Sequence, residues 1–197
     1  MIKKILSLLS ATAFLITGMT ACGTQTNNIL PLENTQSQQT QISSVNRNIS
    51  SYSDDVKLFV ANASKLGVKL TDEQLRTISI QRHVAPNGKW ASRPAENLTA
   101  EQNLDVHFRK HKAEFNIKTK EDYLQRAVAF QKKTGSTVTY YFDITSFAKG
   151  YQSNVVKFDS KTREFGAKKP NGEITTYYTN DTPAAKRFIV VPEDFNF

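Results

Sequence analysis

Two histidines in one segment are the clearest chemical signal in the sequence. His107 and His111 are four residues apart, a spacing that on an α-helix places both on one face, about 40° apart around the axis. Imidazoles exchange protons near neutral pH, so an adjacent pair can act as acid and base. His111 also falls within an apolar stripe, so a structural role in the core is an alternative for it; the stripe contains Leu104, Phe108 and Phe115.

The same pair allows a second chemistry, metal binding. A metal site requires at least one further ligand, for which His83 and Glu114 are the obvious candidates. No Glu directly follows His107, so the zinc-protease helix motif is absent. The single Cys excludes a Cys-rich zinc site. We therefore expect no metal and no cofactor, with a metal-dependent hydrolase as an alternative.

Basic residues surround the histidine pair. Residues 105–169 contain fourteen Lys and Arg against seven Asp and Glu, in a chain whose formal net charge is +8. Such an excess attracts polyanions, including the phosphate backbone of nucleic acids, in a salt-dependent way. A solvated Lys-rich surface would show the same composition.

The histidines lie within a series of predicted helices. Apolar periodicity predicts the first helix, and a capping-box pattern begins the second at Thr71 and the third at Thr99. A fourth begins at Thr119 and stops at Gly135. The first, third and fourth helices are predicted over residues 54–66, 99–115 and 119–134.

The second half of the sequence changes to the period of β-strands. Short β-rich segments separated by turns lie at residues 137–143, 153–159, 162–167 and 173–178, and residues 188–191 add a possible edge strand. Helices followed by a meander predict an α+β fold, with N-terminal helices packed on a small antiparallel β-meander of four to five strands.

The last long strand carries hydroxyl groups behind a hairpin signal. Asn171-Gly172 predicts a type I′ turn, which requires positive φ at both residues. Strict alternation then places Ile174, Thr176 and Tyr178 on one face of the sheet. Tyr rings can stack on bases and hydroxyls can hold a phosphate, although Thr and Tyr are also good strand formers.

The N-terminus predicts export. Residues 1–21 have a charged start, an apolar core too short to span a bilayer, and small residues before Cys22. The segment resembles a bacterial lipoprotein signal, which implies lipidation of Cys22 and anchoring to the cell envelope. An ordinary secretory signal is the alternative. Polar residues 22–53 predict a flexible tether, residues 54–98 a helical adaptor region, and residues 99–197 the α+β domain.

Residues 104–178 resemble the phage and toxin nucleases of the Barnase–EndoU–colicin–RelE type. Those domains often begin with a His-x-x-Lys-His helix, then a Phe, then a capped helix with Tyr-Leu and Ala. The corresponding residues are His107, Lys110, His111, Phe115, Tyr123, Leu124 and Ala127. Their closing strands contain a Gly, an Ile and a Thr two beyond it, matched here by Gly172, Ile174 and Thr176. The position after the second His, often Gly, is Lys112.

The resemblance implies a ribonuclease-like domain that cleaves RNA without a metal, by attack of a ribose 2′-OH on the adjacent phosphate. It implies that His107 and His111 transfer the protons, in either assignment. The other residues that it brings to the site are Arg163 and Thr176 for catalysis, and Lys110, Lys157 and Tyr178 for substrate binding.

The two resemblances, to the nucleases and to a lipoprotein signal, together imply the partners of the chain. They are RNA, with tRNA as one candidate, the membrane through a lipidated Cys22, and an immunity protein that protects the producing cell. The alternative function is a non-catalytic envelope module of the same fold, which binds an acidic polymer or a partner protein.

Overall fold

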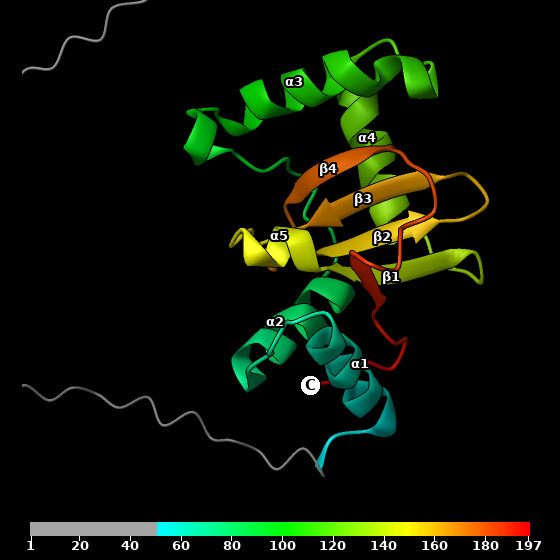
Figure 1. The fold of residues 1–197 in the computed structure, drawn as a ribbon. Helices are drawn as coiled ribbons and strands as arrows, with labels where there is room; N and C mark the ends of the chain where they lie inside the picture. The colour runs from blue at the N-terminus through cyan, green and yellow to red at the C-terminus, as the bar shows by residue number, and fades with distance from the viewer. Residues whose placement is uncertain (1–50) are drawn as a thin grey trace, which may run out of the picture. The chain divides into compact units, whose positions relative to one another are not determined.

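The computed structural model describes residues 51–197 (Figure 1). The predicted signal segment, Cys22 and nearly all of the predicted tether lie outside the described residues. Within residues 51–197, no helix has both the length and the apolar character needed to cross a membrane.

An antiparallel sheet of five strands, in the order β4-β3-β2-β1-β5, forms the centre of the described unit. The first four strands make a meander, and β5 pairs with β1 at the opposite edge from β4. The predicted α+β fold is confirmed. The strands are β1 (Val138–Asp143), β2 (Val155–Asp159), β3 (Glu164–Lys168), β4 (Ile174–Thr179) and β5 (Phe188–Val190).

Four helices precede the sheet, as the sequence predicts. The capping boxes at Thr71 and Thr99 are both formed. A short fifth helix after β1 was not predicted. Asp143 caps its start, because its side chain accepts hydrogen bonds from the backbone N–H groups of Thr145 and Ser146. The helices are α1 (Asp54–Lys65), α2 (Asp72–His83), α3 (Ala100–His111), α4 (Lys120–Lys132) and α5 (Ile144–Ala148).

Helices cover one face of the sheet. Apolar side chains of α1 and α2 pack with Phe142, Val155 and Ile189, while α4 packs with Ile174 and Tyr177 of β4. Residues 54–98 therefore contribute to the same core as the strands, and they belong to the same compact unit.

Aromatic and aliphatic side chains form a separate cluster on the other face. Alternation along β2 places Val156 and Phe158 there, and they pack with Phe165, Ala167 and Phe188. Tyr178 borders this cluster. Helix α3 lies beside β4, at the edge of the sheet (Figure 1).

The β3–β4 hairpin differs from the predicted type I′ turn. Gly172 has a φ of 85°, but Asn171 is not among the residues with positive φ. Gly172 N donates to Lys169 O at 2.9 Å, which gives a four-residue turn with Pro170 second and Gly172 last, the pattern of a type I turn. Because Pro170 sets φ near −65°, it favours this geometry.

Strict alternation along β4 was also wrong. The pairing register shifts between Ala167 and Lys168, which face Thr176 and Ile174 respectively. Thr175 is therefore an extra residue, a β-bulge. The bulge places Ile174 and Tyr177 in the same buried cluster, and leaves Thr176 and Tyr178 on the other face.

Candidate functional site

The two histidines lie in a row of neighbouring rings beside β4. The ring centroids of His107 and His111 are 5.9 Å apart. On one side, Trp90 lies 5.0 Å from His107. On the other, His111 stacks on Tyr178 at 5.2 Å. The side-by-side arrangement expected from the four-residue spacing is therefore present, and Tyr178 connects it to the sheet.

The end of α3 determines how His111 is held. The predicted helix ran to residue 115, but α3 ends at His111 and continues as a 3₁₀ turn, η3 (Lys112–Phe115). The turn brings Glu114 Oε1 to 2.6 Å from His111 Nδ1. Glu114 Oε2 accepts hydrogen bonds from the backbone and hydroxyl of Thr179 in β4. Glu114 therefore fixes the ring and ties it to the sheet.

Glu114 is charged in this arrangement. Its burial opposes ionisation, but the hydrogen bonds from His111 and Thr179 outweigh burial and lower the pKa of Glu114. A carboxylate on Nδ1 orients an imidazole and compensates the charge that the ring acquires when it takes a proton. The bond to Glu114 engages Nδ1 of His111 and leaves Nε2 as the other ring nitrogen, on a residue that is 8% exposed.

His107 has the opposite environment. Burial, followed by the nearby His111 and the cations Arg93 and Lys110, lowers its pKa to about 4. No carboxylate contacts the ring, and its Nδ1 atom is buried without a hydrogen-bond partner in residues 51–197. His107 is therefore a neutral imidazole at pH 7, able to accept a proton.

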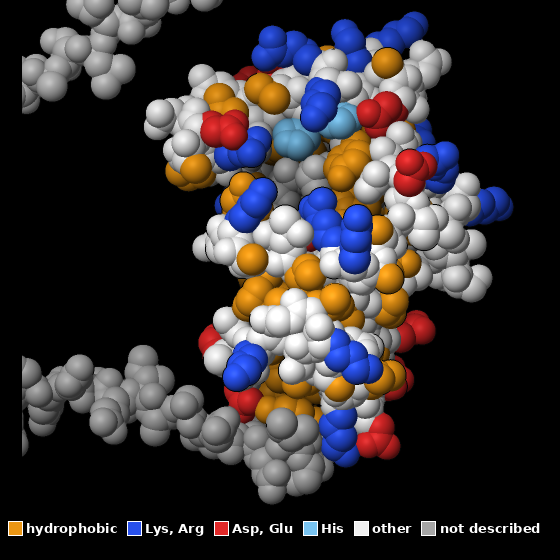
Figure 2. Space-filling view, viewed as in Figure 1, with side chains coloured by type: hydrophobic (Ala, Val, Ile, Leu, Met, Phe, Trp, Pro, Cys, Tyr) orange, Lys and Arg blue, Asp and Glu red, His pale blue; other side chains and the backbone are white. Residues whose placement is uncertain are grey.

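A pocket of about 650 Å³ opens beside His107. His111 is 8% exposed and is not among the residues that line it. His107 and Asn103 of α3 line one wall, Thr176 and Tyr178 of β4 line another, and the apolar cluster supplies the floor through side chains such as Phe165. Figure 2 shows histidine side chains below α3, beside a hollow bordered by Lys and Arg side chains. The pocket is of a size that holds a nucleotide-sized ligand.

Asn103 is a site residue that sequence reasoning missed. Its side chain is 3% exposed, its Nδ2 donates to Ala91 O at 2.8 Å, and its Oδ1 has no partner among the described residues. It lies one helical turn before His107 on the same face. That spacing was visible in the sequence, but an Asn in a helix has no distinctive chemistry.

Arg187 was missed as well. It lines the pocket together with Asp143 and Ser146, and its guanidinium binds Asp143 through two bonds of 2.9 and 2.6 Å. Burial opposes ionisation of Asp143, but these bonds and those from Ser146 lower its pKa. Arg187 precedes β5, far in sequence from the histidines, so no local pattern indicated it.

Lys157 does not reach the site, contrary to the prediction. It is 1% exposed, and its Nζ donates to the backbone oxygens of Gln131, at 2.9 Å, and of Lys133. These carbonyls end α4, on the helix-covered face of the sheet. The physical reason is the period of the strand, which points Lys157 away from the pocket that Val156 lines.

Arg163 is also placed elsewhere. It occupies the β2–β3 turn with a φ of 62°, and its side chain binds Asn180 O and the carboxylate of Asp181. It does not line the pocket. Lys110 is exposed on α3 and does not line the pocket either, although its charge acts on His107.

The proposed metal alternative has little support in the arrangement of ligands. Residues 51–197 contain no group of three or more His, Cys, Asp and Glu side chains placed to hold an ion. His83, a candidate third ligand, lies on α2 and donates from Nδ1 to Ser79 O at 2.9 Å.

Searches with this chain against protein-family models, curated proteins and solved structures find no match in any of the three.

Proposed function

We propose that the chain is an endoribonuclease that cleaves RNA without a metal, using His107 and His111 as the proton-transfer pair. The observation that carries the proposal is the contrast between the two rings. They lie 5.9 Å apart, one neutral and partnerless, the other held by a carboxylate. Two proton-exchanging rings that are close together in different environments are suited to the two halves of acid–base catalysis.

The contrast supports one assignment of the two roles, which the sequence left open. His107 acts as the base and takes the proton of the ribose 2′-OH, whose oxygen attacks the adjacent phosphorus. The bond from phosphorus to the 5′-oxygen breaks, and His111 protonates that oxygen. The products are a 2′,3′-cyclic phosphate and a free 5′-OH, and water returns the protons to their starting positions.

The remaining pocket residues suit the phosphate. Thr176 presents a hydroxyl and Tyr178 a phenol from β4, beside the ring of His111. Arg187 supplies a cation in place of Lys157 and Arg163, the cations predicted from the sequence. Asp143 holds its guanidinium through two hydrogen bonds. Pre-oriented donors of this kind stabilise the extra negative charge of the phosphorane.

The test is cleavage of total RNA and purified tRNA by the purified chain in the presence of EDTA. We expect His107→Ala and His111→Ala each to lower the rate by about a hundredfold or more, the usual contribution of a general acid or base. His83→Ala is the matched control, because the third histidine lies on α2 outside the pocket, and it should retain the full rate.

Two outcomes would contradict the proposal. RNA that stays intact with the unmodified chain from pH 5 to 9 excludes the activity. If such RNA is nonetheless bound, the chain is the non-catalytic module that is the alternative. Equal loss in all three histidine variants would show a stability effect, which thermal unfolding of each variant measures directly.

A further inference from the structure

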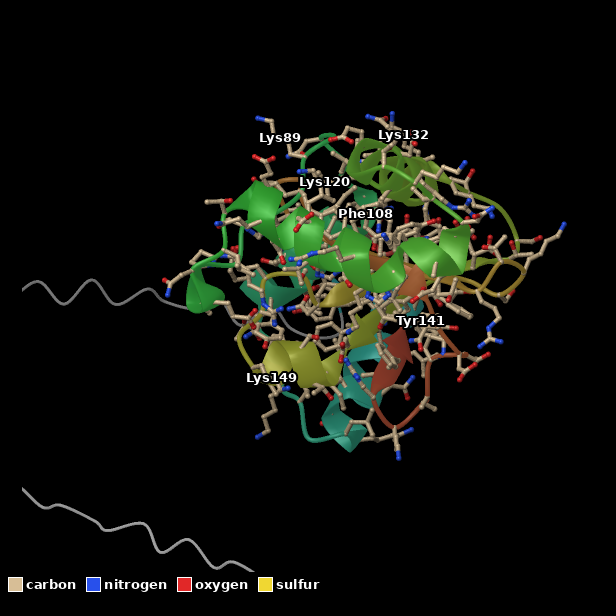
Figure 3. All side chains as sticks on the ribbon, turned by 90° about the horizontal axis from the view of Figure 1, so that it is seen from above. Lys89, Phe108, Lys120, Lys132, Tyr141 and Lys149 are labelled. Atoms are coloured by element: carbon tan, nitrogen blue, oxygen red, sulfur yellow. The ribbon has the colours of Figure 1, made fainter. Side chains whose placement is uncertain are left out.

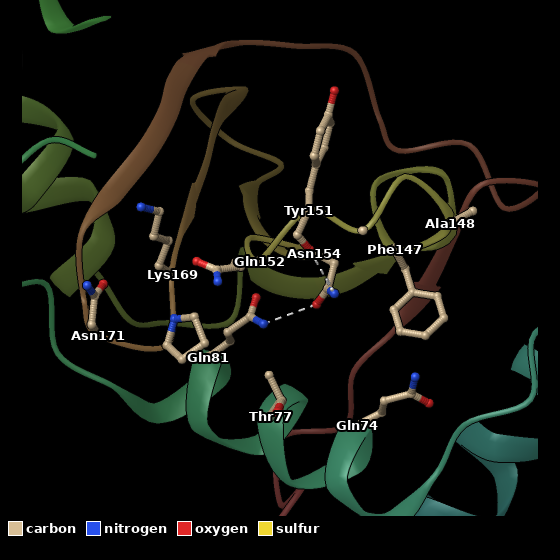
Figure 4. Close-up of a pocket in the computed structure, with 12 residues that line it drawn as sticks. Gln74, Thr77, Gln81, Phe147, Ala148, Tyr151, Gln152, Asn154, Lys169 and Asn171 are labelled. Carbon is tan, nitrogen blue, oxygen red and sulfur yellow. Dashed lines mark hydrogen bonds between the residues drawn. The ribbon is translucent and has the colours of Figure 1, made fainter. Parts of the chain in front are cut away.

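A second pocket of about 710 Å³ adjoins the histidine pocket (Figure 4). Its walls come from α2, from α5 with the following loop, and from the β3–β4 hairpin. Four residues line both pockets: Gly150, Tyr151, Gln152 and Lys169. The two hollows share this border, and we refer to them together as the groove.

Carboxamides dominate the wall of the second pocket. Gln81 is 1% exposed and is fixed by bonds to Asn154 Oδ1, at 3.1 Å, and from Val155 N, at 3.0 Å. Gln152 is exposed, with no hydrogen bond to any described residue. A carboxamide offers donors and an acceptor together, as the edges of nucleobases do.

The charge of the second pocket is suited to a polyanion. Of the described residues that line it, none is acidic, and Lys169 is the cation. Lys169 Nζ lies 3.1 Å from Glu173 Oε2, an ion pair that positions the ammonium at the border between the two pockets.

Tyr151 stands at that border with its ring free. Its backbone is fixed, because its N donates to Ser146 O at 3.0 Å and its carbonyl accepts from Asn154 Nδ2 at 3.3 Å. Its side chain remains 51% exposed, and Figure 4 shows the ring pointing away from α2. An exposed aromatic ring on a fixed backbone is a platform on which an unpaired base stacks.

We propose that the second pocket is a subsite for nucleotides that flank the cleaved phosphodiester in single-stranded RNA. Tyr151 stacks on a base, Lys169 contacts a phosphate and Gln152 bonds a base edge. The subsite rests on the proposed function, because it adjoins the pocket that His107 lines. Helix α2, part of the predicted adaptor region, forms one wall of this subsite.

A binding measurement tests the subsite independently of cleavage. Fluorescence anisotropy of a labelled single-stranded RNA of about ten nucleotides is measured with the full chain carrying His111→Ala, which is expected to slow cleavage about a hundredfold or more. We expect Tyr151→Leu in this background to weaken binding about tenfold, the usual effect of losing one stacked base. Tyr151→Phe should bind as the parent does, because the ring is kept.

Lys169→Ala is expected to weaken binding severalfold. Its control is Lys149→Ala, an exposed lysine near the same loop that lines neither pocket and projects outward in Figure 3. Unchanged binding in Tyr151→Leu and Lys169→Ala would overturn the subsite, as would equal weakening in Lys149→Ala.

Kinetics then separate the subsite from the proposed function. With catalytically intact protein, Tyr151→Leu should lower kcat/KM about tenfold for the longer RNA and less than twofold for a dinucleotide, which reaches only the histidine pocket. Equal losses on both substrates would overturn the subsite while leaving the nuclease proposal standing. If the chain cleaves neither RNA but the variants still differ in binding, the nuclease proposal is refuted and the binding subsite stands.

Discussion

At the scale of single residues, the same side chain takes different roles according to its burial. His107 and His111 are neighbours on one helix, yet only His111 meets a carboxylate. Lys157 and Lys168 look like surface cations in the sequence, but they are 1% and 2% exposed. Burial is the first cause that lowers their pKa values, to about 7 and about 8. Neither is available to a phosphate in the pocket.

The low pKa of His107 predicts a pH dependence of stability. Its folded pKa of about 4 lies below the unfolded value near 6.5, so the unfolded chain binds the extra proton between these values. The contribution of neutral His107 to the free energy of unfolding is complete above pH 6.5 and is lost as the pH falls toward 4. Between pH 7 and pH 5 the loss is about 2 kcal/mol.

Urea unfolding of the unmodified chain and of His107→Gln at both pH values measures this loss. We expect the variant to lose about 2 kcal/mol less than the parent between pH 7 and pH 5, because its amide does not titrate. Parallel losses in the two proteins would contradict the neutral assignment of His107, and with it the role of the base.

At the scale of elements, tight turns bring the site residues together. The 3₁₀ turn after α3 carries Glu114 to both His111 and Thr179. The β3–β4 hairpin docks on the segment before α3, where Asn87 N donates to Gly172 O at 3.1 Å. That segment continues to Trp90, whose ring contacts His107. The hairpin therefore helps to hold Trp90, and through it the ring of His107, in place.

Gly172→Ala is expected to destabilise the fold strongly. Gly172 has a φ of 85°, and an added Cβ would lie 2.5 Å from Ala85 O and 3.1 Å from Asn87 N. The left-handed conformation alone costs about 1 kcal/mol for Ala. The clash with fixed backbone should raise the total above about 2 kcal/mol.

Gly67→Ala is the matched control for this prediction. Its φ is 80°, but nothing lies within 4 Å of the added Cβ, so only the conformational cost applies. Urea unfolding should show a loss at least about 1 kcal/mol larger for Gly172→Ala than for Gly67→Ala. Equal losses would show that the hairpin moves freely away from the 85–87 segment.

At the scale of the whole molecule, the formal charge of +8 overstates the cations available to RNA. Arg109, Lys120 and Arg126 all form ion pairs with acidic side chains. The cations that border the groove are Arg93, Lys169 and Arg187. Each is also paired with an acidic side chain, Glu96, Glu173 and Asp143 respectively, so it is their position in the groove that sets them apart. Affinity for RNA should therefore depend on these few residues more than on the total.

The salt dependence of RNA binding tests this view. If each of the three cations meets one phosphate of single-stranded RNA, the logarithm of the association constant falls against the logarithm of salt concentration with a slope of about −2. Anisotropy titrations of the His111→Ala variant between 50 and 200 mM salt give the slope. A slope near zero would exclude phosphate contacts in the groove, and a much steeper one would indicate the peripheral lysines.

Much of the fold was predictable because its signals are local. The capping boxes at Thr71 and Thr99, the apolar periodicity of the helices and the short alternating strands each depend on residues within a few positions of one another. They predicted four helices, the meander and its edge strand, and the four-residue spacing predicted that His107 and His111 share a face. The register shift at Thr175 was hidden because it depends on pairing with the neighbouring strand.

The composition of the site was decided by tertiary structure. Asn103, Tyr151 and Arg187 share a pocket with His107 only because α3, the α5–β2 loop and the residue before β5 pack around one sheet. Lys157 is a cation on β2, a strand that lines the pocket through Val156. Its own side chain points to the opposite, helix-covered face of the sheet. The sequence by itself specified local conformation and the types of reactive group available. Packing between distant segments determined which groups share a pocket, because no short-range pattern encodes contacts made across the core.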